Sequence, residues 1–306
     1  MVLNIKTNSN GVLLMLDVLQ QILIFGMVLG GIYALASLGM GLAWGLMHVV
    51  NFAHGEWIMI SMYTTYWLSV LLHLDPYLLI PINIGVGMAI GAASQKFVFA
   101  PVSKRGGGAL MTILSTFGIS MLMTGIAQAL WTQTIYTLPN PYINTSLRIG
   151  SISISAAHLN GLVISVVTIL AIYFILKKTL TGKAILGTSE ITGDTEAASL
   201  MGVDTEKIKI LSLGLAGAAT GVAGTVIATF YYVNPTVGIT WGLLGFVVVT
   251  LGGLASFSGL LVSGILVGVL EAVSDVFLGQ AYGYILVYAV FILVLYVRPK
   301  GLKGRA

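Results

Sequence analysis

Residues 208–232 read IKILSLGLAGAATGVAGTVIATFYY and contain a single charged side chain, Lys209. An α-helix rises about 1.5 Å per residue, so a run of this length crosses the roughly 30 Å hydrocarbon core of a bilayer. Glycines recur in it at spacings of three and four residues, which places them on one helical face: Gly214, Gly217, Gly221 and Gly224. The run is therefore predicted to be a membrane-spanning helix packed closely against a neighbour.

The same kind of run recurs from end to end of the chain. Apolar runs lie near 18–45, 56–73, 77–98, 109–131, 159–176, 208–232, 240–255, 259–278 and 282–297. The first is long enough to contain a break and the seventh is short enough to be re-entrant, so we expect eight to ten spans. Only 8% of the residues are charged, against about 25% in soluble domains. The sequence predicts an all-α polytopic membrane protein, with residues 1–306 forming one transmembrane domain.

The sequence lacks the motifs of several functional classes. There is no cysteine, and no phosphate-binding G-x-x-x-x-G-K-[ST] loop or hydrolase motif occurs. We therefore expect a non-catalytic chain that holds no cofactor, ATP or metal of its own. The basic residues lie at the ends of apolar runs, which indicates contact with the membrane surface and no nucleic-acid partner.

The basic residues also set the orientation. Twelve of the 14 lysines and arginines fall on alternating connections: Lys96, Lys104, Arg105, Lys177, Lys178, Lys183, Lys207, Lys209, Arg298, Lys300, Lys303 and Arg305. Cytoplasmic loops are enriched in such residues, so these connections are predicted to be cytoplasmic. The start of the chain is then external with nine spans and cytoplasmic with ten.

The cytoplasmic loop 177–207 contains a short helical pattern. Asp194 is placed to cap a helix whose first turn carries Glu196, and Gly202 is placed to end it. The apolar face of this helix would consist of Ala197, Ala198, Leu200 and Met201. Asp204 can cap the helix that follows. The residues leave two interpretations open: a solvated linker, or a helix that docks on another protein.

Four motifs together resemble the permease subunits of ABC importers of the branched-chain amino acid (LivH/LivM) type, and the LivH type more closely. They are NFAHGEW (51–57), EAASLMGV (196–203) with Asp194 before it, RPKGLKGR (298–305) and YYVNPTVGITWGLLGFVVVTLGGLASFSGLLVSGILVGVLEA (231–272). The resemblance implies that Asp194 to Gly202 form the coupling helix that contacts an ATPase. Relatives often carry arginine before this Asp, whereas here the stretch is LGTSEITGD, so an ion pair with the ATPase is not carried over.

The resemblance also implies a complex in the cytoplasmic (inner) membrane of a prokaryote. The partners would be a second, LivM-type permease, two cytoplasmic ABC ATPases that bind ATP and Mg, and an external solute-binding protein. The solutes would be branched-chain or other small amino acids, or related solutes such as urea and amides. The alternative is a self-sufficient, ion-gradient-driven secondary transporter or a channel for a small polar solute.

Two polar islands interrupt the apolar pattern. The first contains Asn51, His54 and Glu56. A metal site with His48 is one interpretation, but the spacing matches no compact helical site. The other two are a cytoplasmic turn and a helix break beside the translocation path. The second contains Asn234 and Thr236, and it repeats the Asn-x-x-x-Gly spacing of the first. We expect the islands on opposite membrane sides, as in an inverted repeat of halves 18–176 and 208–298. Their polar residues are candidates for the translocation path.

Two features are predicted for the external side. Glu271 and Asp275 lie one helical turn apart, and we expect both to reach the external interface, with a proton relay as the alternative. The connection 132–158 contains the alternating pattern LRIGSISIS, which predicts a short hairpin. A binding protein would meet this side.

Overall fold

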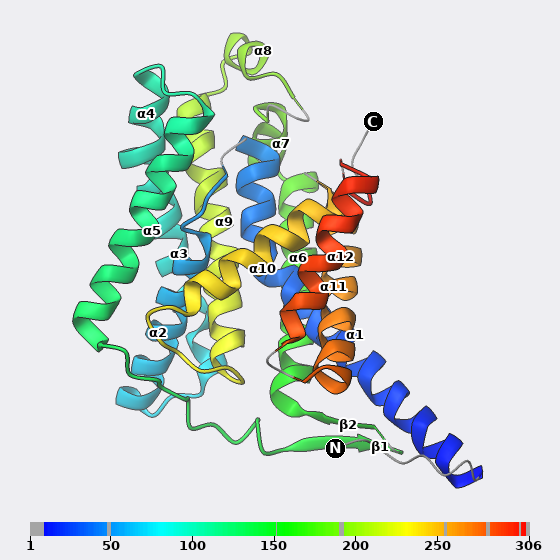
Figure 1. The fold of residues 1–306 in the computed structure, drawn as a ribbon. Coiled ribbons are helices and arrows are strands. Elements are labelled where there is room, and N and C mark those ends of the chain that lie inside the picture. Colours follow the sequence, from blue (N-terminus) through cyan, green and yellow to red (C-terminus); the bar gives the residue numbers. More distant parts are fainter. Residues whose placement is uncertain are drawn as a thin grey trace.

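The computed structural model describes residues 9–47, 50–150, 152–189, 193–253, 256–279, 282–299 and 301–303. It is a helical bundle with one two-stranded hairpin, which confirms the predicted all-α membrane fold (Figure 1). Each predicted apolar run coincides with one main helix: α1 (Ser9–Met47), α2 (His54–Leu72), α3 (Ile80–Ser94), α5 (Ala109–Trp131), α6 (Ala156–Lys178), α9 (Thr205–Ala228), α10 (Val237–Gly252), α11 (Phe257–Phe277) and α12 (Gly283–Val297).

Shorter elements connect these helices. They are the 3-10 turn η1 (Pro76–Leu79), the π-helical turn η2 (Gln95–Phe99), α4 (Ala100–Lys104), α7 (Leu180–Gly187), α8 (Thr195–Leu200), β1 (Ser146–Ile149) and β2 (Ile152–Ser155). The strands pair antiparallel with Ser146 opposite Ser155, so the predicted hairpin is confirmed. Because η1, α3, η2 and α4 continue one another, Pro76–Lys104 is one of six described helical stretches long and apolar enough to cross a membrane. α10 and α12 are apolar but shorter.

The two ends of the bundle differ in charge and in content. α8 and the C-terminal end of α12 lie at one end, while the hairpin and the beginning of α1 lie at the other (Figure 1). Lys104 and Lys207 belong to the end that carries α8. The positive-inside rule makes that end cytoplasmic and places the start of α1 outside. α1 is one uninterrupted helix, so the expected break lies after the first run and not within it.

Glycine contacts bring two pairs of helices close together. A Cβ built on Gly87 of α3 would lie 2.0 Å from the carbonyl oxygen of Gly217 on α9, and the reverse distance is the same. On the other side, a Cβ on Gly264 of α11 would lie 2.6 Å from the carbonyl oxygen of Gly30 on α1. Only residues without a Cβ permit this approach, which confirms the predicted packing role of the glycine faces.

α1 and α9 form the centre of the bundle, and α5 lies at its margin. In α9, 83% of the most apolar stretch is buried within the chain, whereas in α5 only 6% is buried. α9 packs against α1, α2 and α3. A movement of α9 would therefore reach most of the structure, while α5 presents its apolar surface to lipid or to another chain.

Candidate functional site

The polar islands lie at the first residues of α2 and α10, and these two helix starts touch. A Cβ on Gly55 would lie only 1.8 Å from the carbonyl oxygen of Gly238, and a Cβ on Gly238 would lie 3.0 Å from the backbone nitrogen of Glu56. The connections that lead to the islands start at opposite ends of the bundle, after α1 and after α9, as the expected topology requires. Each connection turns back into the bundle after its long helix, so both islands reach the same level.

The contact lies well inside the bundle. The Nε2 atom of His54 lies 2.7 Å from the carbonyl oxygen of Ala36. Since Ala36 precedes the end of α1 at Met47 by eleven residues, this level is about 16 Å from the cytoplasmic end of α1 at 1.5 Å per residue. Such a depth agrees with a helix break within the membrane and disagrees with a turn at the cytoplasmic surface.

Three polar side chains of the first island are buried and only partly bonded. Asn51, His54 and Glu56 are each 1% exposed or less. Asn51 Oδ1 accepts a hydrogen bond from Ala53 N at 3.0 Å, and Glu56 Oε1 accepts one from Ser120 Oγ at 2.8 Å. Within the described chain, Asn51 Nδ2, His54 Nδ1 and Glu56 Oε2 have no partner. Buried polar atoms without a partner cost about 1–3 kcal/mol each, so such a group suggests a ligand, water or a function.

The second island is more open. Asn234 and Thr236 are half-buried, and Thr236 Oγ1 donates to Asn234 Oδ1 at 3.4 Å. The neighbouring Val233 pairs with Tyr136 of the external connection in an isolated β-bridge. Neither Thr236 nor its counterpart Ala53 caps its helix with a side chain. The positive ends of two helix dipoles are thus brought together without side-chain caps, and the carboxylate of Glu56 lies in the first turn of α2.

The geometry of the first island does not support a metal site. The ring of His54 reaches back to α1, whereas the carboxylate of Glu56 points to α5. His48, the third proposed ligand, lies outside the described residues. In the part of the chain that the structure describes, no three His, Cys, Asp or Glu side chains come together to hold a metal ion.

The coupling segment forms the helix that the sequence predicts. Asp194 Oδ1 accepts hydrogen bonds from the backbone nitrogens of Glu196 at 2.9 Å and Ala197 at 3.1 Å, so it is the N-cap of α8. Gly202 follows the helix with φ of +84°, a left-handed conformation that favours glycine. Thr195 Oγ1 donates to the carbonyl oxygen of Thr188, which ties α8 to the end of α7.

The apolar side chains of this segment project from the bundle. Leu200 is 90% exposed and Met201 is 86% exposed, while Ala197 is exposed and Ala198 is half-buried. The approach to α8 includes Glu190, which lies outside the described residues. A six-residue helix with two bare apolar side chains has almost no core of its own. This arrangement is typical of a surface that another protein covers.

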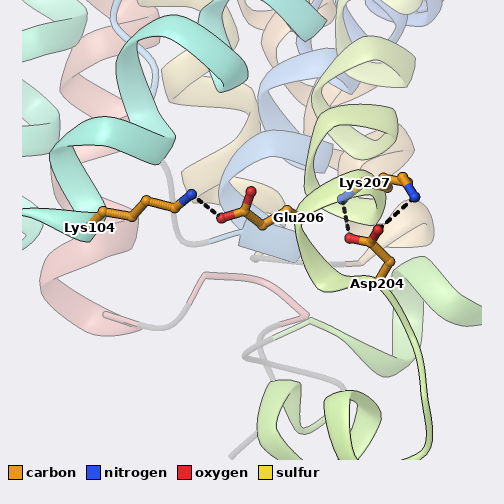
Figure 2. A network of polar contacts seen from close by, with 4 residues as sticks. All are labelled: Lys104, Asp204, Glu206 and Lys207. Atoms are coloured by element: carbon orange, nitrogen blue, oxygen red, sulfur yellow. Dashed lines mark hydrogen bonds and ion pairs between the residues drawn. The ribbon is translucent and has the colours of Figure 1, made fainter.

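Ion pairs mark the junction between α8 and the bundle. Asp204 Oδ1 caps α9 by accepting from Lys207 N at 3.1 Å, and its other oxygen lies 2.8 Å from Lys207 Nζ (Figure 2). The Lys207 ammonium holds the pKa of the Asp204 carboxyl below its usual value. Glu206 pairs with Lys104 of α4 at 2.5 Å. These exposed pairs contribute little energy individually, but they fix the first turn of α9 directly after α8.

Two features escaped the sequence reasoning. Asn83 of α3 is fully buried, and its Nδ2 donates to the hydroxyls of Thr65 on α2 and Thr225 on α9, both at 2.7 Å. A lone asparagine inside an apolar run was the available signal.

The other feature is Glu271, which is only 8% exposed and accepts a short hydrogen bond from the hydroxyl of Tyr33. The expectation that Glu271 reaches the external interface is wrong, whereas Asp275 is half-exposed.

Comparison with known proteins gives one consistent result. The family model described as "Branched-chain amino acid transport system / permease component" matches residues 22–295. The chain is 28% identical over 296 residues to the high-affinity branched-chain amino acid transport system permease protein LivH of Salmonella typhimurium, covering 92% of this chain and 94% of that protein. It is 29% identical over 307 residues to the corresponding protein BraD of Pseudomonas aeruginosa, covering 94% and 96%. A probable LivH of Methanocaldococcus jannaschii is 24% identical over 303 residues, covering 95% of each. No solved structure matches the chain.

Proposed function

The chain belongs to the branched-chain amino acid transport permease family, and we propose that it is one permease subunit of an ATP-driven ABC importer. The importer lies in the cytoplasmic (inner) membrane of a prokaryote and moves branched-chain or other small amino acids inward. This chain is non-catalytic. The observation that carries the proposal is α8, a capped cytoplasmic helix whose Leu200 and Met201 are bare.

The cytoplasmic partner is a pair of ABC ATPases, which bind ATP and Mg. Each of the two ATPases offers a cleft, and α8 of this chain occupies one of these clefts. Only residues 201–204 separate α8 from α9, and Asp204 fixes the first turn of α9. Because that linker is short and α9 is central, closure of the ATPases moves α9 together with α8.

The other partners are a second, LivM-type permease and an external solute-binding protein. The external hairpin suits a docking platform because it is anchored to the central helix α1. Gln21 of α1 donates to Ser153 O at 2.7 Å and accepts from Ser153 N at 2.8 Å. A platform held by two hydrogen bonds can transmit contact with the binding protein to α1.

The translocation path passes the two helix starts. Its candidates are Asn51, His54, Glu56, Asn234 and Thr236, the polar residues placed around the contact of Gly55 with Gly238. Two related halves of opposite orientation, 18–176 and 208–298, would explain this placement. In support, α1 packs on α11 through glycines as α9 packs on α3, and α2 and α10 both begin at the midpoint.

The first test is affinity purification of the chain from its own cells in mild detergent, followed by mass spectrometry and an ATPase assay. We expect P-loop ATPases and a second hydrophobic chain to co-purify. Buried Glu56 and Glu271 favour one rival, a gradient-driven transporter. A lone chain without ATPase activity after crosslinking would support that rival and contradict the importer.

The second test addresses α8 directly. Leu200→Asp should abolish uptake while the protein still accumulates in the membrane, because an unpaired charge buried in the ATPase cleft costs several kcal/mol. Leu200→Met is the matched control, since it preserves an apolar side chain of similar size, and it should retain uptake. Wild-type uptake by Leu200→Asp would remove the coupling role of α8.

A further inference from the structure

The external half of the bundle contains a cavity of about 500 Å³. It lies between the connection from α9 to α10, the last turns of α11 and the beginning of α12. Its volume is within the roughly 300–1,000 Å³ of small-molecule sites. The polar side chains on its wall are Thr137, Thr229, Tyr231, Tyr232, Glu271, Asp275 and Tyr284.

Among the described residues, no basic side chain pairs with the acids on this wall. One oxygen of Glu271 accepts from Tyr33, and the other has no hydrogen-bond partner among the described residues. No lysine, arginine or histidine of the described ranges lies within 4.0 Å of Glu271 or Asp275. Glu271 is more than nine-tenths buried and faces the cavity. A buried carboxylate without a counter-charge costs several kcal/mol, so the site is built to receive a cation or a proton.

The rest of the wall favours an organic cation over a metal ion. Tyr231 stacks on Tyr232 with ring centroids 4.4 Å apart, and its ring centroid also lies 5.6 Å from that of Trp241. Aromatic faces attract ammonium groups, whereas calcium and magnesium ions need many oxygen ligands. Two carboxylates and scattered hydroxyls provide too few, and no metal-holding cluster occurs in the described part of the chain.

We propose that this cavity binds the ammonium group of the incoming solute, with Glu271 as its counter-ion and Asp275 as the second acid at the entrance. The tyrosine rings surround the alkyl part of the solute. A zwitterionic amino acid then enters with its ammonium group first, and a solute that lacks the cation is disfavoured. The proposal rests on the proposed function for its solute, but binding to the chain alone needs no partner subunit.

The test is a titration of the purified full chain in lipid nanodiscs, followed by saturation-transfer NMR. The probe is isobutylammonium, and the neutral isostere isobutanol is the reference. We expect Glu271→Gln to weaken isobutylammonium binding at least tenfold and to leave isobutanol binding unchanged. The amide of glutamine still accepts from Tyr33, so a merely structural role of Glu271 would leave both probes unchanged. Equal binding of isobutylammonium by both proteins would overturn the proposal.

Further variants keep the outcome decisive. Tyr33→Phe removes the hydrogen bond but keeps the carboxylate, so it should change isobutylammonium binding less than threefold. Asp275→Asn, at the half-exposed acid, should weaken isobutylammonium binding at least threefold. If the Glu271→Gln protein fails to fold, Asp275→Asn is the deciding variant. Equal loss of both probes in Glu271→Gln would show a collapsed cavity and overturn charge recognition. None of these measurements involves ATP or a partner subunit. A negative result would therefore contradict the cation site alone, and the importer assignment is tested separately by the affinity purification.

Discussion

Gly55→Ala should separate α2 from α10 at the point where both helices begin. The new Cβ would lie 1.8 Å from the carbonyl oxygen of Gly238, while ordinary van der Waals contact begins at 3.4 Å. This oxygen belongs to the backbone, so no side chain can rotate away. The helix starts must therefore move apart by about 1.6 Å, and overpacking of this kind costs about 1–3 kcal/mol.

The expected loss appears in two measurements. The free energy of unfolding, followed by SDS titration in mixed micelles, should fall by about 1–3 kcal/mol. Solute uptake by the assembled transporter should fall as well, because the displaced helix starts carry the candidate path residues. Gly85→Ala on α3 is the matched control, since a Cβ there meets nothing within 4 Å, and it should stay within about 0.5 kcal/mol of wild type.

Gly238→Ala tests the same contact with a smaller steric conflict. Its Cβ would meet Glu56 N at 3.0 Å, a smaller conflict than that of Gly55. The destabilisation should decrease in the order Gly55, Gly238, Gly85. A Gly55→Ala protein as stable as the Gly85→Ala control would refute the close contact of α2 with α10 and the depth assigned to both islands.

Two further predictions concern other contacts. Asn83→Ala should lower the free energy of unfolding in the same titration by about 1–2 kcal/mol, because the hydroxyls of Thr65 and Thr225 lose their shared donor; an unchanged midpoint would mean that these hydrogen bonds are absent. The hydrogen bond to the Asp75 carboxylate raises the pKa of Tyr142, so Asp75→Asn should bring that pKa down toward its usual value near 10. The pKa of Tyr142 is measured by absorbance at 295 nm, with the titration of the Tyr142→Phe protein subtracted. The contact of Tyr142 with Asp75 stabilises the fold below the ordinary tyrosine pKa, and this stabilisation is lost as the pH rises through the raised pKa of Tyr142.

Local sequence patterns predicted the helices and their ends well. All nine apolar runs coincide with helices because span length and hydropathy act within one segment. The caps Asp194 and Asp204 were predictable for the same reason, since each bonds to backbone nitrogens two or three residues ahead. The external hairpin follows from alternation over nine residues. These features depend on neighbours in sequence.

Contacts between distant segments were not predictable in this way. The carboxylate of Glu271 looked like an interfacial charge because its partner Tyr33 lies 238 residues away in sequence. The contact between the two islands was not predicted for a different reason. Positive-inside counting assigns each connection to a side, but it contains no information on how deeply a connection returns into the bundle. Depth here is set by tertiary contacts such as that of His54 with Ala36.

The cytoplasmic helix and the buried helix starts belong to one path of backbone contacts. α8 leads into α9 within four residues, and a Cβ on Gly224 of α9 would lie 2.7 Å from the carbonyl oxygen of Ile58 on α2. α2 in turn begins at Gly55, against Gly238 of α10. Each step joins backbone to backbone without an intervening flexible side chain that could absorb a displacement. A push on α8 is therefore expected to alter the contact of α2 with α10, because packed interfaces shift between discrete arrangements more readily than they deform.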